Sequence, residues 1–371
     1  EIMPSLVGSE MCIRDRSFLN HYAKAFPTSE LHDMVRLMAA ESLFSSSPAD
    51  AAKFYGSINF DKLPAKMRPD ILYKSAWAVA QAGDRETAAK LLTTFIDGYP
   101  RDPRICEALT LRGDMYAKTK KETEALQDFD RVIARWPKEE SAAAAWQRAA
   151  QIYAGRQDLA NMAKYYEGLI KNFPKTSPAA LAEAHFLLGR AAFDQGDFQS
   201  SISHMSEAKT LDPQKYGEQV NVLTVLSYHK LQDVNKLKEA LETLQKENPA
   251  AVSRVPDVIP AWLGLQAYGM KDLETADKYM TWATQNDQLQ NVKKVIWRNL
   301  AKVRLALKKY DRALVASNNF LKVEDQPYRR ADGMLDKASI LLGLGKYAEA
   351  RKTAEEALAL GVEGPLMASM K

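Results

Sequence analysis

Catalytic motifs are missing from this sequence of 371 residues. It contains no G-x-x-x-x-G-K-[ST] phosphate loop, no G-x-S-x-G nucleophile turn, no H-E-x-x-H zinc helix and no C-x-x-C pair. Paired acids such as Glu139-Glu140 and Glu355-Glu356 are most simply interpreted as solvated helix faces. Because a catalytic site needs polar groups that converge, we expect that the protein is not an enzyme and uses no cofactor.

Residues that bind metals are scarce. The only cysteines are Cys12 and Cys106, and the five histidines are scattered. His185 and His204 could face each other across a pair of helices, which would be the start of a metal site. No cysteine or carboxylate spacing supports that alternative, so we expect no metal and interpret these histidines as partly exposed.

Long apolar runs and an excess of charge of one sign are absent too. No stretch approaches the ~18 apolar residues of a membrane-spanning helix. The 51 basic and 47 acidic residues give a net charge of only +4, and the two signs are interspersed. A nucleic-acid-binding protein normally concentrates basic residues on one face. We therefore expect no membrane span in this segment and no nucleic-acid partner.

An internal repeat is what the sequence does have, and Leu109–Pro137 is its clearest copy. A small residue, Gly113, is followed twelve positions later by a second, Ala125, then by Phe129 and a closing proline. The first small position recurs in steps of 36 to 39 residues, with valine in one copy. Its occupants are Ala76, Gly113, Ala150, Gly189, Val225, Gly264, Ala301 and Ala338.

Helix packing explains this pattern. Two antiparallel helices can cross closely only where side chains are small, and a large residue nearby fills the neighbouring gap. Proline cannot continue a helix, so it ends the early units, up to Pro249. Gly83-Asp84, Gly155 and Gly196-Asp197 are the predicted turns inside three units.

The copies resemble tetratricopeptide repeats. Trp146, Ala150, Tyr153, Tyr166 and Pro174 match the pattern of that family in one copy. Leu188-Gly189, Gly196-Asp197-Phe198 and Pro213 match it in the next, and Trp297, Leu300-Ala301, Tyr310 and Ala313 near the end. The resemblance covers roughly residues 30–371 and implies an all-α fold. We expect a right-handed superhelical α-solenoid of about nine antiparallel helix pairs.

The two ends of the sequence depart from the repeat. Residues 1–16 have no helical pattern and resemble a translated sequencing adapter, so we expect an assembly artefact or else a disordered N-terminus. We assign 17–371 to the solenoid, with truncation expected at both ends. Ser17 to Pro27 is predicted to be a second helix without its partner, and Gly364 to Ala368 the start of a further first helix.

The resemblance also implies a binding surface. In this family the concave wall is lined by set positions of the first helices. Projected onto this sequence, those positions predict partner-binding residues at Tyr73, Trp77, Phe186, Arg190, Phe193, Tyr268, Arg298 and Lys302. The aromatic members are expected to anchor an interface. Arg298 and Lys302, one helical turn apart, are expected to receive a carboxylate from the partner.

The function that follows is a non-enzymatic scaffold that binds a peptide or protein segment on its concave face. The alternative is a sensor or docking region of a larger enzyme or transcriptional regulator. The linker Phe173-Pro174-Lys175-Thr176-Ser177-Pro178 resembles bacterial envelope proteins of the family, including outer-membrane assembly lipoproteins and cell-division coordinators. We therefore expect a periplasmic or outer-membrane-associated location rather than a cytoplasmic one, with a lipid anchor upstream as an option.

Overall fold

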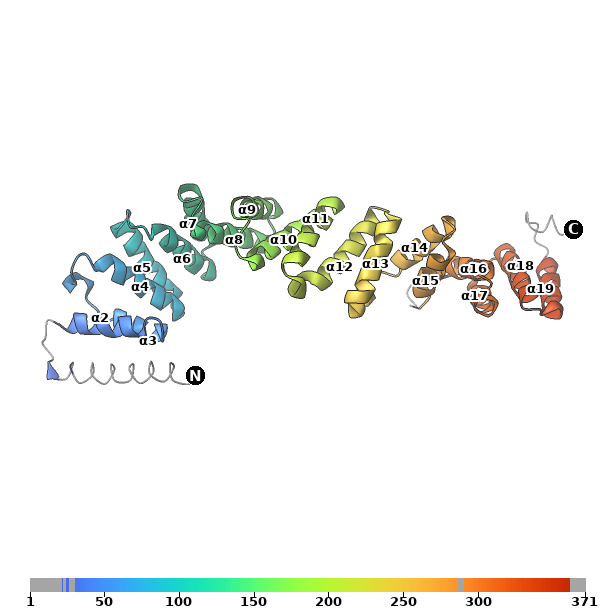
Figure 1. Cartoon of the computed structure of the whole chain (residues 1–371), viewed down its shortest axis with the longest axis horizontal. Helices are drawn as coiled ribbons and strands as arrows, with labels where there is room; N and C mark the ends of the chain where they lie inside the picture. Colours follow the sequence, from blue (N-terminus) through green and yellow to red (C-terminus); the bar gives the residue numbers. More distant parts are fainter. Residues whose placement is uncertain (1–21, 23–24, 27–30, 286–289, 361–371) are drawn as a thin grey trace. The chain divides into compact units, whose positions relative to one another are not determined.

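Antiparallel helix pairs make up the chain, as the repeat predicts (Figure 1). The computed structural model describes residues 22, 25–26, 31–285 and 290–360. Those residues form α-helices and two short 3-10 helices, with no strand among them. The predictions for residues 1–16, for most of the helix from Ser17 to Pro27 and for Gly364 to Ala368 lie outside the described residues.

The chain divides into two compact units, Glu1–Leu188 and Gly189–Lys371, and the division falls inside α10. Pairs in the first unit begin with α2 (His32–Leu43) and α3 (Pro48–Tyr55), followed by the 3-10 helix η1 (Phe60–Lys62). They continue with α4 (Arg68–Gln81), α5 (Arg85–Gly98), α6 (Ile105–Lys118), α7 (Glu122–Arg135), α8 (Glu140–Gly155) and α9 (Leu159–Asn172).

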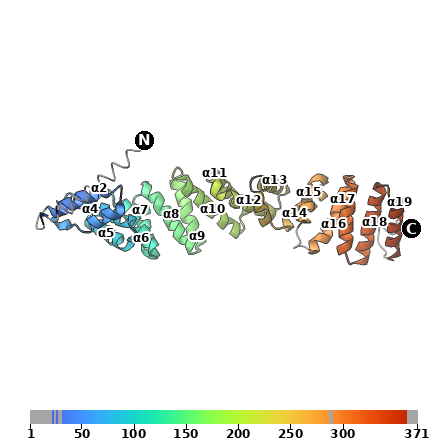
Figure 2. The same cartoon turned by 90° about the horizontal axis from the view of Figure 1, so that it is seen from below.

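Helix α10 (Pro178–Gln195) contains the division, and further helices in the same paired arrangement follow it in the second unit. These further helices are α11 (Phe198–Leu211), α12 (Pro213–Lys230), α13 (Val234–Glu247), η2 (Pro249–Arg254), α14 (Val258–Gly269), α15 (Leu273–Ala283), α16 (Gln290–Ala306), α17 (Tyr310–Val323), α18 (Pro327–Gly343) and α19 (Tyr347–Ala359). Helices α16 to α19 lie side by side (Figure 2). The described residues thus contain nine pairs, which confirms the predicted number.

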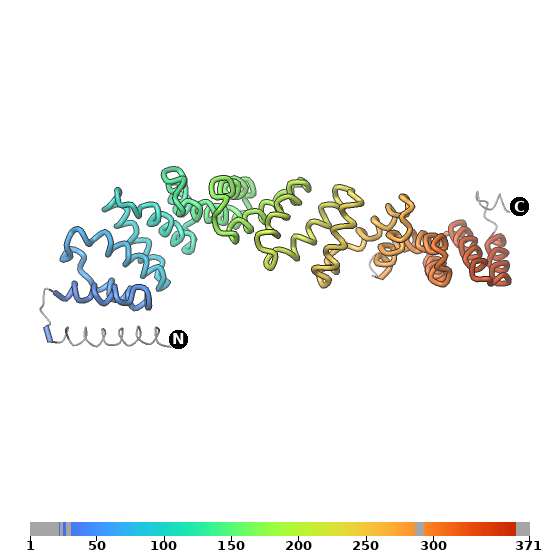
Figure 3. The backbone as a smooth tube through the Cα atoms, in the orientation of Figure 1, coloured from blue at the N-terminus to red at the C-terminus, as the bar shows by residue number. Residues whose placement is uncertain are grey.

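Short polar turns reverse the chain inside each pair (Figure 3). Five second helices begin after an aspartate whose carboxylate accepts a hydrogen bond from the backbone N–H three residues on, as Asp84 does from Thr87 at 3.1 Å. The residue before that aspartate has positive φ; it is Gly83 in one turn and Gln157 in another. The turn predicted at Gly155 begins one residue later, at Arg156, because Gly155 is still the last residue of α8.

The predicted small positions lie in the cores of the pairs. All eight are buried, and an added Cβ on Gly113 would approach Phe129 Cε1 to 2.6 Å. Gly189 and Gly264 face Met205 and Met280 in the same way. In each case the partner is sixteen residues later in the sequence, on the second helix of the same pair. This single contact sets how closely the two helices approach.

One buried ion pair ties α15 to α16 in the second unit. Arg304 Nε donates to Asp277 Oδ1 at 2.7 Å, and both residues are more than nine-tenths buried. Lys309 Nζ contacts the other carboxylate oxygen of Asp277 at 3.0 Å. Burial by itself would raise the pKa of Asp277, but hydrogen bonds from Arg304 and Lys309 outweigh that effect and lower it.

We expect Gly113→Ala to lower the free energy of unfolding by roughly 1–3 kcal/mol, because the methyl group would collide with the buried Phe129 ring. The matched control is Gly98→Ala, since Gly98 is also helical but has no atom within 4 Å of an added Cβ. That control should be neutral or stabilising by up to about 1 kcal/mol. Urea denaturation measures both, and equal effects would contradict the packing described.

We expect Asp277→Asn to lower the free energy of unfolding at neutral pH by roughly 3–5 kcal/mol, because Arg304 stays buried without its counter-ion. The carboxylate has a lowered pKa when folded, so its contribution is present above the ordinary pKa of ~3.9 and is lost as pH falls through the folded value. Denaturation curves from neutral pH to pH ~2.5 should therefore show wild type and variant converging. A constant difference would contradict this account.

Candidate functional site

The first helices of successive pairs form one face of the first unit, the first-helix surface. A hollow of about 480 Å³ lies on it, across α4, α6 and α8. Its lining combines aromatic, acidic and small polar side chains. The residues are Tyr73, Trp77, Glu107, Thr110, Leu111, Asp114, Glu139, Glu140, Ser141, Ala144 and Arg148. Two of the predicted partner-binding residues, Tyr73 and Trp77, are among them.

Helical periodicity places the two aromatic residues together. Tyr73 and Trp77 are one turn apart on α4, and both are half-buried. The Trp77 ring packs against Phe44 at 4.9 Å between centroids, while Tyr73 packs against Phe95 at 5.5 Å. These contacts with neighbouring helices hold both rings in fixed positions at the edge of the hollow.

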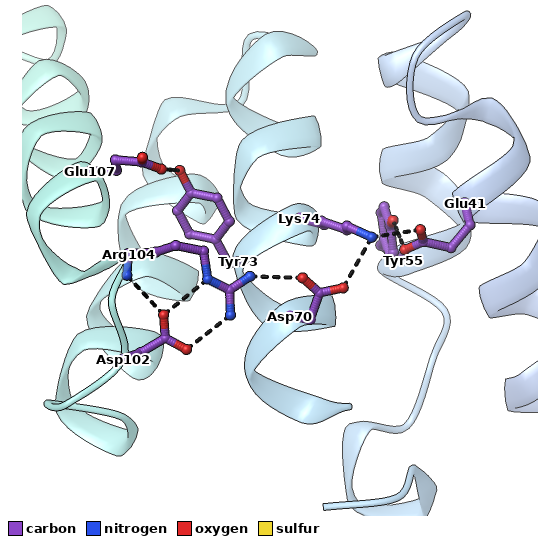
Figure 4. Close-up of polar contacts among 8 residues, drawn as sticks. All are labelled: Glu41, Tyr55, Asp70, Tyr73, Lys74, Asp102, Arg104 and Glu107. Atoms are coloured by element: carbon purple, nitrogen blue, oxygen red, sulfur yellow. Dashed lines mark hydrogen bonds and ion pairs between the residues drawn. The ribbon is translucent and has the colours of Figure 1, made fainter. Parts of the chain in front are cut away.

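Polar contacts run from helix to helix along the same surface. Figure 4 shows this polar ladder, formed by Glu41, Tyr55, Asp70, Tyr73, Lys74, Asp102, Arg104 and Glu107. Lys74 Nζ lies 2.7 Å from Glu41 and 3.0 Å from Asp70. Arg104 donates to Asp70 at 2.8 Å and to both oxygens of Asp102.

The ladder ends at the hollow, where the Tyr73 hydroxyl donates to Glu107 Oε2 at 2.9 Å. Burial, and then the hydrogen bond to Glu107, raise the pKa of Tyr73 above its ordinary value. The hydroxyl therefore stays protonated at neutral pH and keeps Glu107 oriented. Below it, the guanidinium of Arg104 lies 5.1 Å from the Tyr73 ring centroid.

The other predicted partner-binding residues are not part of this hollow. Phe186 is only 9% exposed, so packing accounts for most of its surface. Arg190 is exposed, and Phe193 packs edge-on against Phe198 at 5.4 Å. Tyr268 is partly buried against the core of its own unit.

Arg298 and Lys302 already have carboxylate partners within the chain. Arg298 donates to Asp332 and Asp336 at 3.2 Å each, and Lys302 Nζ lies 3.7 Å from Asp336. These acids are on α18, the first helix of the next pair. Both cations, which were expected to be free for a partner, are thus paired with acids on the next first helix. Arg104 is paired with Asp70 in the same way.

Sequence reasoning missed part of the lining. Glu139, Glu140, Ser141 and Ala144 reach the hollow from the first turn of α8 or the residue before it, whereas the projected positions lie further along each first helix. Glu139 and Glu140 were expected to be no more than a solvated face. Arg148 was missed as well, because nothing in the repeat pattern distinguishes it.

No group of three or more metal-ligating side chains occurs in the described part of the chain. Among the described helices, none is both long and apolar enough to cross a bilayer.

Phe186→Ala tests whether that ring belongs to the core. We expect it to lower the free energy of unfolding by roughly 3–5 kcal/mol, as for a buried phenylalanine. Arg190→Ala, an exposed position on the same helix, should change it by less than about 0.5 kcal/mol. Thermal and urea unfolding of both variants provide the comparison, and an undiminished stability of Phe186→Ala would contradict the burial.

Comparison with known proteins supports the repeat assignment. Models described as tetratricopeptide repeat match residues 73–140 and 298–368, 144–176, and 182–215, together more than half of the chain. No curated protein matches.

Several solved structures are similar. A tetratricopeptide repeat protein from Parabacteroides merdae is 12% identical with a TM-score of 0.40, over 81% of this chain and 96% of that one. The C-terminal part of a repeat-containing protein from Cytophaga hutchinsonii is 14% identical with a TM-score of 0.45, over 80% and 98%. MamA from Desulfovibrio magneticus is 18% identical with a TM-score of 0.36, over 48% and 97%. The repeat matches and the nine helix pairs together identify the chain as a tetratricopeptide repeat protein.

Proposed function

We propose that this protein is a non-enzymatic scaffold that binds a segment of a partner protein on its first-helix surface. Tetratricopeptide repeats generally serve as protein-interaction scaffolds. The observation that carries the proposal is the hollow across α4, α6 and α8, with Tyr73 and Trp77 at its edge. A partner segment lying there would contact three successive pairs at once.

The chemistry of the hollow suits recognition of a polypeptide. Half-buried aromatic side chains supply contact area at little cost in conformational entropy, and such residues are frequent binding hot spots. Glu107, Thr110 and Ser141 place polar groups beside the two rings. The polar ladder and the ring contacts hold the wall in place before binding, which lowers the entropic cost of association.

We also propose an envelope location in a bacterium, supported by the resemblance of the Phe173-to-Pro178 linker to envelope members of the family. Fractionation of the source cells, followed by immunoblotting for this chain, tests it. Recovery in the periplasmic or membrane fraction is expected, and recovery with cytosolic markers would contradict the proposal.

Replacing Trp77 tests the proposed surface. Segments selected from a random peptide display library against the full chain should bind Trp77→Ala at least about tenfold more weakly, because the aromatic anchor is lost. Ala144→Trp should weaken binding similarly, since it fills the hollow from an exposed position without altering the core. Fluorescence anisotropy with labelled peptides gives the affinities.

The matched control is Tyr347→Ala, which removes an aromatic side chain that is 71% exposed on α19. It should bind as wild type does. Unchanged binding by both hollow variants would exclude this hollow as the site, and failure to select any segment would contradict the proposed function.

A further inference from the structure

The charges around the hollow are unequal. Four carboxylates line it, those of Glu107, Asp114, Glu139 and Glu140, whereas Arg148 is the only cation of the lining. Asp114 is paired with Arg148, whose Nε lies 3.0 Å from Asp114 Oδ1, and with Lys118, whose Nζ lies 3.6 Å from Asp114 Oδ2. Three carboxylates remain.

Those three have no ion-pair partner among the described residues. Glu107 accepts only the hydrogen bond from the Tyr73 hydroxyl, which carries no charge. The cation nearest to Tyr73, Arg104, is engaged by Asp102 and Asp70. Glu139 is the N-cap residue of α8 and Glu140 is its first residue.

Lys138, the residue before Glu139, does not line this hollow. It lines a neighbouring one together with Phe173 and Pro174, and Glu140 borders both hollows. The local excess of negative charge is also opposite in sign to the chain as a whole, whose net charge is +4. The acidic character is therefore a property of this site rather than of the overall composition.

Aromatic side chains complete the environment. A cation held near the face of a tyrosine or tryptophan gains electrostatic attraction from the ring, most of all for tryptophan. Tyr73 and Trp77 share the hollow with the unpaired carboxylates. The guanidinium of Arg104 already lies 5.1 Å from the Tyr73 ring centroid, so Trp77 is the ring left for a further cation. An aromatic wall beside uncompensated acids is complementary to a basic side chain.

We propose that the hollow binds an extended protein segment through a basic side chain, with arginine preferred over lysine. This inference rests on the proposed function and specifies the partner's chemistry. Arginine is preferred because its planar guanidinium can stack on an aromatic ring while donating two hydrogen bonds to one carboxylate.

The test uses the full chain and four pools of fluorescent heptapeptides, random except for a central arginine, lysine, glutamine or glutamate. We expect the arginine pool to bind most tightly, then lysine, with the glutamine and glutamate pools at least about tenfold weaker. Binding of the arginine pool should also weaken with added salt, because partly exposed charges are screened.

Two triple variants that change the net charge equally distinguish attraction by the carboxylates of the hollow from attraction by the overall charge of the chain. Glu107→Gln, Glu139→Gln and Glu140→Gln combined should weaken the arginine pool about tenfold or more. The control combines Glu167→Gln, Glu207→Gln and Glu356→Gln, three exposed carboxylates outside the hollow that have no ion pair in the described structure. It changes the net charge equally and should bind as wild type does. Circular dichroism melting verifies that both variants fold.

The other outcomes would overturn the inference. Equal weakening by both triple variants would assign the attraction to net charge. Equal binding of the glutamine or glutamate pool, still lost in Ala144→Trp, would refute the basic partner and leave the proposed function intact. No binding of any pool to wild type would contradict both.

Discussion

The close approach of two helices at a small residue is the contact on which the rest of this structure depends. Gly113 lies against Phe129, Gly189 against Met205 and Gly264 against Met280, each pair separated by sixteen residues. No pair can bury its whole apolar face by itself, so each must stack on the next. The distance between the two helices of a pair therefore determines which of their faces are left to pack against the neighbouring pairs.

Polar contacts between neighbouring pairs join residues that are about one repeat apart in the sequence. They hold the side chains of the first-helix surface in position. Lys74 reaches Glu41 across 33 residues, Arg104 reaches Asp70 across 34, and Arg298 reaches Asp336 across 38. Each contact joins neighbouring pairs rather than distant ones. Such contacts pair cations of the first-helix surface with carboxylates about one repeat away, whereas Glu107 contacts only the uncharged Tyr73 hydroxyl.

The fold could be predicted from the sequence because its determinants are local and periodic. The recurring small residues, Ala88 and Ala125 as well as Ala76 and Ala150, are buried where the repeat places them. Periodicity also placed Tyr73 and Trp77 on one face of α4, where both line the hollow, and their role in binding stays a prediction. Periodicity cannot tell whether a residue on such a face lines the binding surface or packs in the core. Phe186 was predicted to bind a partner, but its side chain is only 9% exposed.

The sequence pattern could not predict which charged side chains form ion pairs with one another. Arg298 and Lys302 were expected to await a partner's carboxylate, but their counter-ions lie one repeat further on, and no rule of composition assigns those pairs. The acids at the start of α8 were missed for a related reason. Their role depends on how α8 stacks on α6, which is a property of the packed pairs rather than of either helix.

Fluorine NMR of the chain labelled with 5-fluorotryptophan tests the central claim most directly. The six tryptophans give one resonance each, and single Trp→Phe variants assign them. Titration with the tightest-binding peptide of the arginine pool should shift the Trp77 resonance and leave that of Trp297, in the second unit, unchanged. A shift of Trp297 without one of Trp77 would place binding elsewhere and contradict the account.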